Sequence, residues 1–150
     1  ANRKEVIRIV RDYEPDLVFS HRPNDYHPDH RYSAALVQDA AYIVTVPNMC
    51  PLTPYLETNP VIMYLSDNFQ KPNPFLPDVV LDIDDVIEKK VEMLHCHTSQ
   101  MYEWLPYNSG VLDEVPAEEG DRKIWMANRR LKAFAETAER FRGKLVELYG

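Results

Sequence analysis

The sequence predicts an α/β protein with a mainly parallel sheet, and three observations support this prediction. Short apolar runs typical of strands alternate with longer segments in which apolar residues recur at helical spacing. The resulting order is helix, strand, helix, strand, strand, helix, as expected when helices connect parallel strands. The chain has 150 residues, of which 45% are hydrophobic, enough for one domain with its own core. We therefore expect a single α/β domain over residues 1–150.

The first part of the chain contains two predicted helices with a strand between them. Residues 3–13 predict an amphipathic helix that ends at Glu14-Pro15. Its predicted apolar face consists of Val6, Ile9, Val10 and Tyr13. The run Leu17-Val18-Phe19 is continuous and apolar, as in a buried parallel strand. A stripe of small and aliphatic residues predicts a second helix from Pro28 to about Val44, packed against the sheet.

Residues 45–60 predict a long loop. Prolines at positions 47, 51, 54 and 60 exclude a regular element there. Loops of this length often serve as lids or as partner surfaces. The sequence leaves two roles open: covering a site, or contacting another subunit in a homo-oligomer.

The rest of the chain predicts two strands and two helices. Strands are expected at Val61–Leu65 and Val79–Ile83. Asp85, with Glu88 three residues later, resembles a capping box at the start of a helix. The longest helical pattern runs over residues 121–149. Three strands make a small sheet with an open edge, so we expect the sheet to be incomplete at its N-terminal side.

The net charge and the two cysteines indicate which binding partners and which cellular compartment the protein is expected to have. The formal net charge of −7 argues against nucleic acid or an anionic membrane as a partner. No apolar run approaches the length of a membrane span. Cys50 and Cys96 have no metal-like spacing, and free thiols in a reducing cytoplasm are expected, with disulfide pairing left open.

The polar segment from Ser20 to Arg31 is the candidate site, because it follows a predicted strand and precedes a predicted helix. Ligands bind at the carboxyl ends of strands in open α/β sheets. Pro28 restricts His27 to an extended backbone and favours the start of a helix, which places His30 in the first turn. Asp29 lies near the positive end of the helix dipole and can orient a neighbouring imidazole. The two histidines therefore suit a catalytic or metal-binding role; ordinary solvated histidines are the alternative.

The segments Pro15–Phe19 and Asn24–Arg31 resemble the second signature of the LmbE-like/PIG-L zinc-dependent de-N-acetylases. The resemblance continues through Pro77–Ile83, Val86–Lys90 and His97-Thr98-Ser99-Gln100. It covers most of residues 1–105, and its most specific part is His27-Pro28-Asp29-His30. The resemblance implies a Rossmann-like three-layer fold.

The same resemblance implies a role for each matched residue. His30 matches the zinc-binding histidine, and His27 the histidine that stabilises the oxyanion and protonates the leaving amine. Asp29 matches the residue that orients His27, and His97 a residue near the substrate pocket. Flanking the motif, Asn24 and Asp25 are candidates for contacts with substrate hydroxyls, although such residues also stabilise turns by bonding their own backbone.

One departure from the family concerns the remaining zinc ligands. The family's first signature, His-Pro-Asp-Asp-Glu, supplies two further ligands and the carboxylate that activates water. This string does not occur in the 150 residues. We expect either that the chain is the C-terminal portion of a longer protein or that its zinc site is incomplete.

The function that follows is zinc-dependent hydrolysis of an N-acetyl group from an amino sugar such as N-acetylglucosamine, or from a related small amide. The alternative is a non-catalytic carbohydrate-binding or assembly domain that keeps the fold without a complete zinc site. A zinc amidase acting on substrates other than sugars is a third hypothesis.

Overall fold

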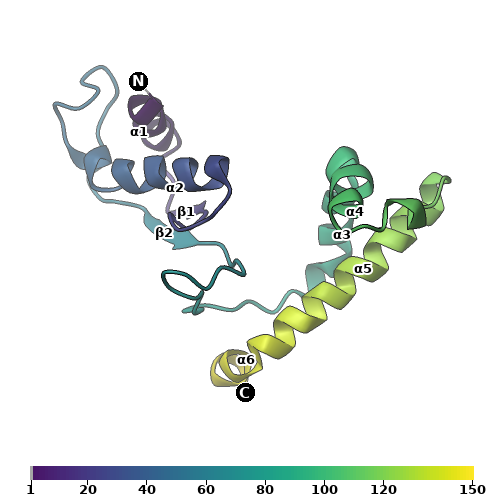
Figure 1. The fold of residues 1–150 in the computed structure, drawn as a ribbon. Helices are drawn as coiled ribbons and strands as arrows, with labels where there is room; N and C mark the ends of the chain where they lie inside the picture. Colours follow the sequence, from purple (N-terminus) through teal and green to yellow (C-terminus); the bar gives the residue numbers. More distant parts are fainter. Residues whose placement is uncertain (1) are drawn as a thin grey trace. The chain divides into compact units, whose positions relative to one another are not determined.

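The structure is a computed structural model that describes residues 2–150, and the chain divides into two compact units, Ala1–Leu76 and Pro77–Gly150. Each unit is described by itself. Together the described residues form a mainly helical protein with one small parallel sheet, which is compatible with the predicted α/β class (Figure 1). The assignment of residues 1–150 to a single domain stays a prediction.

The first unit contains the parallel sheet. Its elements are α1 (Asn2–Tyr13), β1 (Leu17–Ser20), α2 (Pro28–Ala40), a 3-10 helix (Tyr42–Thr45) and β2 (Val61–Tyr64). The two strands pair in parallel, with Leu17 opposite Val61 and Ser20 opposite Tyr64. The predicted order of helix, strand, helix and strand is confirmed here. The exposed fractions of 40% for Leu17 and 57% for Phe19 correct the expectation that β1 is buried throughout.

The core of the first unit lies between α1, α2 and the segment that follows α2. Ile7, Ala40, Val44 and Cys50 form its buried centre. The predicted apolar face of α1 is wrong in part, because Ile9 and Tyr13 are exposed and Ile7 is buried. The buried face of α1 instead includes Arg11, four residues after Ile7 on the same side of the helix.

Arg11 is a buried arginine that binds backbone carbonyl groups. Its side chain is enclosed, and the residue is 2% exposed. The guanidinium donates to carbonyl oxygens of residues 43–53: those of Ile43, Val44, Val46, Met49, Cys50 and Thr53. A loop that runs close to a core must satisfy its backbone polar groups, and here one side chain does so. The first part of the proline-rich loop is therefore fastened to α1.

The second unit is helical. It contains α3 (Ile87–His95), a π-helix (Gln100–Trp104), α4 (Leu105–Asn108), α5 (Glu119–Arg140) and α6 (Arg142–Tyr149), with 3-10 helices at Asp84–Val86 and Leu112–Glu114. The core residues of this unit are Val91, Met101, Tyr102 and Met126. Burial raises the pKa of the Tyr102 hydroxyl, whose oxygen lies 2.6 Å from Nδ1 of His95.

Two expectations for the second unit are corrected. The predicted strand at Val79–Ile83 is absent from the described residues, and no other strand of this unit is there to pair with it. A strand needs a neighbour for its backbone N–H and C=O groups, which an apolar run alone does not supply. The predicted helix over 121–149 is divided at Phe141, close to Gly143, which lowers helix propensity.

The capping box expected from Asp85 and Glu88 does not form. The helix α3 begins at Ile87 after a 3-10 turn, and Val86 at its N-terminus makes no side-chain capping bond. Instead, the carboxylate of Asp82 accepts the backbone N–H of Asp84 at 2.9 Å. An acidic residue earlier in the chain thus stabilises the turn that leads into the helix.

Candidate functional site

The candidate site lies where β1 ends and α2 begins. His27 is the N-terminal capping residue of α2, with an extended backbone (φ −71°, ψ 124°), and Pro28 is the first helical residue. The sequence-based placement of His27 just outside the helix and of His30 in its first turn is therefore confirmed. The proline explains both, because it excludes a helical conformation for His27 and starts a helix without an N–H of its own.

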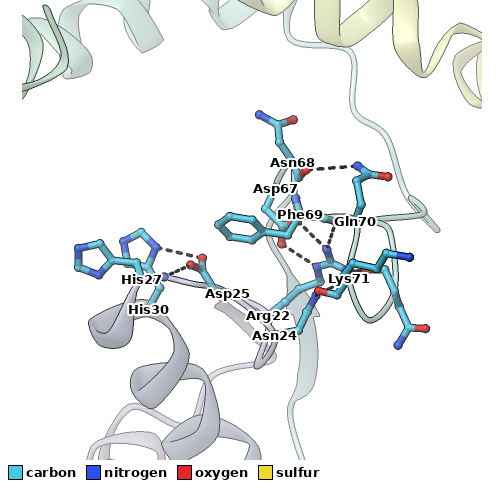
Figure 2. Close-up of polar contacts among 11 residues, drawn as sticks. Arg22, Asn24, Asp25, His27, His30, Asp67, Asn68, Phe69, Gln70 and Lys71 are labelled. Carbon is cyan, nitrogen blue, oxygen red and sulfur yellow. Dashed lines mark hydrogen bonds and ion pairs between the residues drawn. The ribbon is translucent and has the colours of Figure 1, made fainter. Parts of the chain in front are cut away.

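Asp25 is the buried carboxylate of the site, with an exposed fraction of 4%. One carboxylate oxygen, Oδ1, accepts the backbone N–H of His27 at 2.8 Å. The other, Oδ2, lies 3.0 Å from Nδ1 of His30 (Figure 2). The backbone oxygen of Asp25 accepts from the Arg31 guanidinium at 3.0 Å. This single residue therefore joins the loop to the first turn of α2.

Three imidazole rings stack beside Asp25. The rings of His21 and His30 are nearly parallel, with centroids 4.0 Å apart and planes at 4°. The His27 ring lies on His30 as well, at 4.5 Å and 26°. The two histidines of the predicted site, His27 and His30, thus lie next to each other in the structure. His30 keeps 43% of its side chain exposed, so its ring is accessible from solvent.

The residues His21, Asp25 and His30 form a group that fits a metal ion in its chemistry. One ligand atom from each lies within 4.8 Å of the others. Two imidazoles and a carboxylate are a donor set that zinc accepts. Zinc–nitrogen bonds of roughly 2.0–2.1 Å put tetrahedral donors about 3.3 Å apart, so the group would have to contract to hold one ion with all three members. His30 is the member that the family resemblance matches to a zinc-binding histidine.

Arg22 supports the loop through the hydrogen bonds of its guanidinium group. Its guanidinium makes a two-pronged ion pair with Asp67, at 2.6 and 2.5 Å, and donates to the backbone oxygens of Phe69 and Asn73. The hydrogen bond to Asp67 raises the pKa of the Arg22 guanidinium, which therefore stays charged. Figure 2 shows this pair joining the loop after β1 to the loop after β2. Arg22 thus serves the structure of the site.

The Arg22→Ala variant is expected to destabilise the first unit by roughly 3 kcal/mol, because it removes one member of a largely buried ion pair. The side chains of Arg22 and Asp67 are only 10% and 14% exposed. Urea unfolding, monitored through hydrogen exchange of the backbone amides of β1 and β2, measures the decrease in the free energy of unfolding. Arg3→Ala is the matched control, because Arg3 makes an exposed pair with Asp39 at 3.8 Å. Equal stability of the two variants would contradict the structural role of Arg22.

The other predicted site residues lie in different surroundings. Asp29 is exposed on the first turn of α2, and no hydrogen bond joins its carboxylate to an imidazole in the part of the chain that the structure describes. Asn24 turns its amide toward the backbone oxygens of Lys71 and Asn73, each at 3.5 Å. His97 is an exposed residue of the second unit, just after α3. The roles predicted for these residues stay predictions.

Sequence reasoning missed His21 and the position of Asp25. His21 directly follows β1, and that place at the carboxyl end of a strand was the available signal. The sequence predicts a substrate contact for Asp25, and the structure shows in addition that its carboxylate has two partners in the histidine motif. Its contact with substrate stays a prediction.

Comparison with known proteins shows a similarity to a protein whose activity is described. The diacetylchitobiose deacetylase of Thermococcus kodakarensis is 30% identical to this chain over 115 residues. The chain is similar to part of a deacetylase. The match covers 70% of this chain and 41% of the relative, so the chain spans less than half of that protein's length. No family model matches the chain. Within residues 2–150, no helix has both the length and the apolar composition that crossing a membrane requires.

Proposed function

We propose that this protein is a zinc-dependent hydrolase that removes the N-acetyl group from an amino sugar, as a member of the LmbE-like/PIG-L de-N-acetylases with a Rossmann-like three-layer fold. The observation that carries the proposal is the histidine cluster at the end of β1, in which Asp25 contacts His30 and His27 lies on the His30 ring. The partial similarity to a diacetylchitobiose deacetylase supports the reaction and the class of substrate.

In this proposal His30 holds the zinc ion. The chemistry that bound zinc supplies is the activation of water near neutral pH and the polarisation of a carbonyl group. Catalytic zinc sites usually have three protein ligands and one open position. His21, whose ring is stacked on that of His30, adds a second imidazole at the same place. The exposed side of the His30 ring leaves room for a small substrate to approach.

His27 performs the proton transfer in this proposal. The backbone N–H of His27 is fixed by Asp25, so its exposed ring stands at the entrance to the helix, next to His30. A positioned imidazolium there can donate a hydrogen bond to the developing oxyanion and then a proton to the departing amine. In this proposal the carboxylate of Asp29, two residues after His27, assists His27. Asn24 and His97 contact the substrate.

Release of free amine from a panel of substrates tests the proposal. The complete protein, loaded with zinc, is incubated with diacetylchitobiose, with N-acetylglucosamine and with N-acetylated amino acids, and the amine is quantified. We expect release from the acetylated amino sugars, little from the amino-acid conjugates, and none after a chelator removes the metal. Release from the amino-acid conjugates alone would replace the sugar substrate by another amide.

A binding measurement with the same sugars separates the proposal from the non-catalytic alternative. If the zinc-loaded protein binds diacetylchitobiose but releases no amine, the protein is a carbohydrate-binding domain and the proposed hydrolysis is wrong. The second hypothesis is motivated by the sequence, which has no His-Pro-Asp-Asp-Glu string within its 150 residues.

A further inference from the structure

Asp25 is a buried carboxylate whose two oxygens both accept hydrogen bonds from the histidine motif. Burying an ionised carboxylate is costly unless its oxygens are satisfied, and here the backbone N–H of His27 and the ring of His30 do so. Both oxygens of the buried carboxylate therefore have a hydrogen-bond partner in the histidine motif.

The contact between Asp25 and His30 determines which nitrogen of His30 carries the proton. An ionised carboxylate has no hydrogen to give, so the imidazole nitrogen facing it must be the donor. Since that nitrogen is Nδ1, at 3.0 Å from Oδ2, a neutral His30 ring carries its lone pair on Nε2. The lone pair is what a metal ion coordinates, and carboxylate–histidine pairs of this kind are common behind zinc.

We propose that Asp25 is the positioning residue of the zinc-binding histidine: it fixes the tautomer and the orientation of His30 and leaves Nε2 available to the metal. This inference rests on the proposed function for the identity of the metal. It gives Asp25 a role different from the substrate contact expected from sequence, and it separates Asp25 from Asp29, which serves His27 in the proposal above.

A direct zinc bond from Asp25 is the competing arrangement, since Asp25 belongs to the group that could hold an ion. The two arrangements make opposite demands on Oδ2. An ion bound by both Oδ2 and His30 would have to take the place of the hydrogen bond between Oδ2 and Nδ1, because Nε2 lies on the far side of the imidazole ring from Oδ2. Oδ1 accepts the backbone N–H of His27 at the helix start. As a positioning residue, Asp25 keeps both contacts that the structure gives it. The geometry favours the second arrangement.

The tautomer of His30 is the first test, and it needs neither metal nor substrate. Two-dimensional nitrogen–proton NMR of the metal-free protein at pH of about 8, where ordinary imidazoles are neutral, identifies the protonated ring nitrogen. We expect Nδ1–H for His30 in the wild type. In Asp25→Asn the amide NH₂ can face Nδ1 while the amide oxygen keeps the His27 N–H, which reverses the tautomer to Nε2–H. A wild-type His30 with Nε2–H overturns the inference.

Zinc affinity is the second test, measured by competition of zinc alone with a chelating dye. We expect binding roughly 10–100-fold weaker in Asp25→Asn, the usual effect of removing the carboxylate behind a ligand histidine, with partial recovery in Asp25→Glu. Asp39→Asn is the matched control on the exposed face of α2, and its affinity should equal that of the wild type. Equal affinity of wild type and Asp25→Asn overturns the inference.

Circular dichroism of each variant checks that it is folded, and the wild-type tautomer decides the question even if Asp25→Asn does not fold. Failure of the proposed function has a different signature. A protein that shows the Nδ1–H tautomer and the loss of zinc affinity, yet releases no amine from any acetylated sugar, refutes the hydrolase proposal and leaves the role of Asp25 intact.

Discussion

The His30→Ala variant is expected to lose stoichiometric zinc binding and, with it, hydrolysis of the N-acetylated substrate. His30 is the histidine whose orientation is fixed by a buried carboxylate while its ring stays accessible, so the proposed site depends on its nitrogen. Metal analysis of the purified complete protein gives the zinc content directly. Full occupancy in the variant would refute the assignment of His30 as a ligand.

Loss of zinc must be separated from loss of structure in this experiment. Removing the His30 ring takes a donor away from Oδ2 of Asp25, and an unsatisfied buried acceptor costs about 1–3 kcal/mol. The thermal midpoint of the variant should therefore fall, while its circular dichroism at room temperature stays native. Gln38→Ala, an exposed change on the same helix, is the control that should keep both zinc and the midpoint.

The His27→Ala variant is expected to keep its zinc and to lose turnover by roughly 10²–10⁴, the usual range for a positioned acid–base group. The contact that fixes this residue to Asp25 comes from its backbone N–H, which alanine retains. The loop and His30 should therefore stay in place, and the loss should appear in kcat at saturating substrate.

Steady-state kinetics of zinc-loaded His27→Ala, with the metal content measured on the same sample, provides the check. Asp39→Asn again serves as the surface control. Turnover close to that of the wild type would remove His27 from the mechanism. A loss of zinc equal to that of His30→Ala would instead make His27 a ligand.

Local sequence signals predicted the start of the site well. The backbone of His27 and the helical position of His30 follow from one proline, whose effects act on its immediate neighbours. The strands β1 and β2 were also predictable, since each is a short apolar run bounded by polar residues. The strand expected at Val79–Ile83 does not form, because strand pairing depends on a distant partner that local composition does not specify.

The carboxylate partner of His30 could not be predicted from spacing alone. Asp29 is adjacent to His30 in sequence, but neighbouring residues on a helix do not face each other. Asp25 reaches the ring because the loop turns back before Pro28, a path set by the Arg22–Asp67 pair and by the His27 backbone. The same path of the loop brings the ring of His21 into stacking contact with that of His30.

Arg11 gives the first unit an internal reporter of its own opening. A protease that recognises arginine side chains can engage this one only after the guanidinium has left the carbonyl oxygens around it. The exposed Arg3 lies on the same helix and carries no such restriction. When closing is faster than cutting, the rate of trypsin cleavage after Arg11 follows the population of the open form.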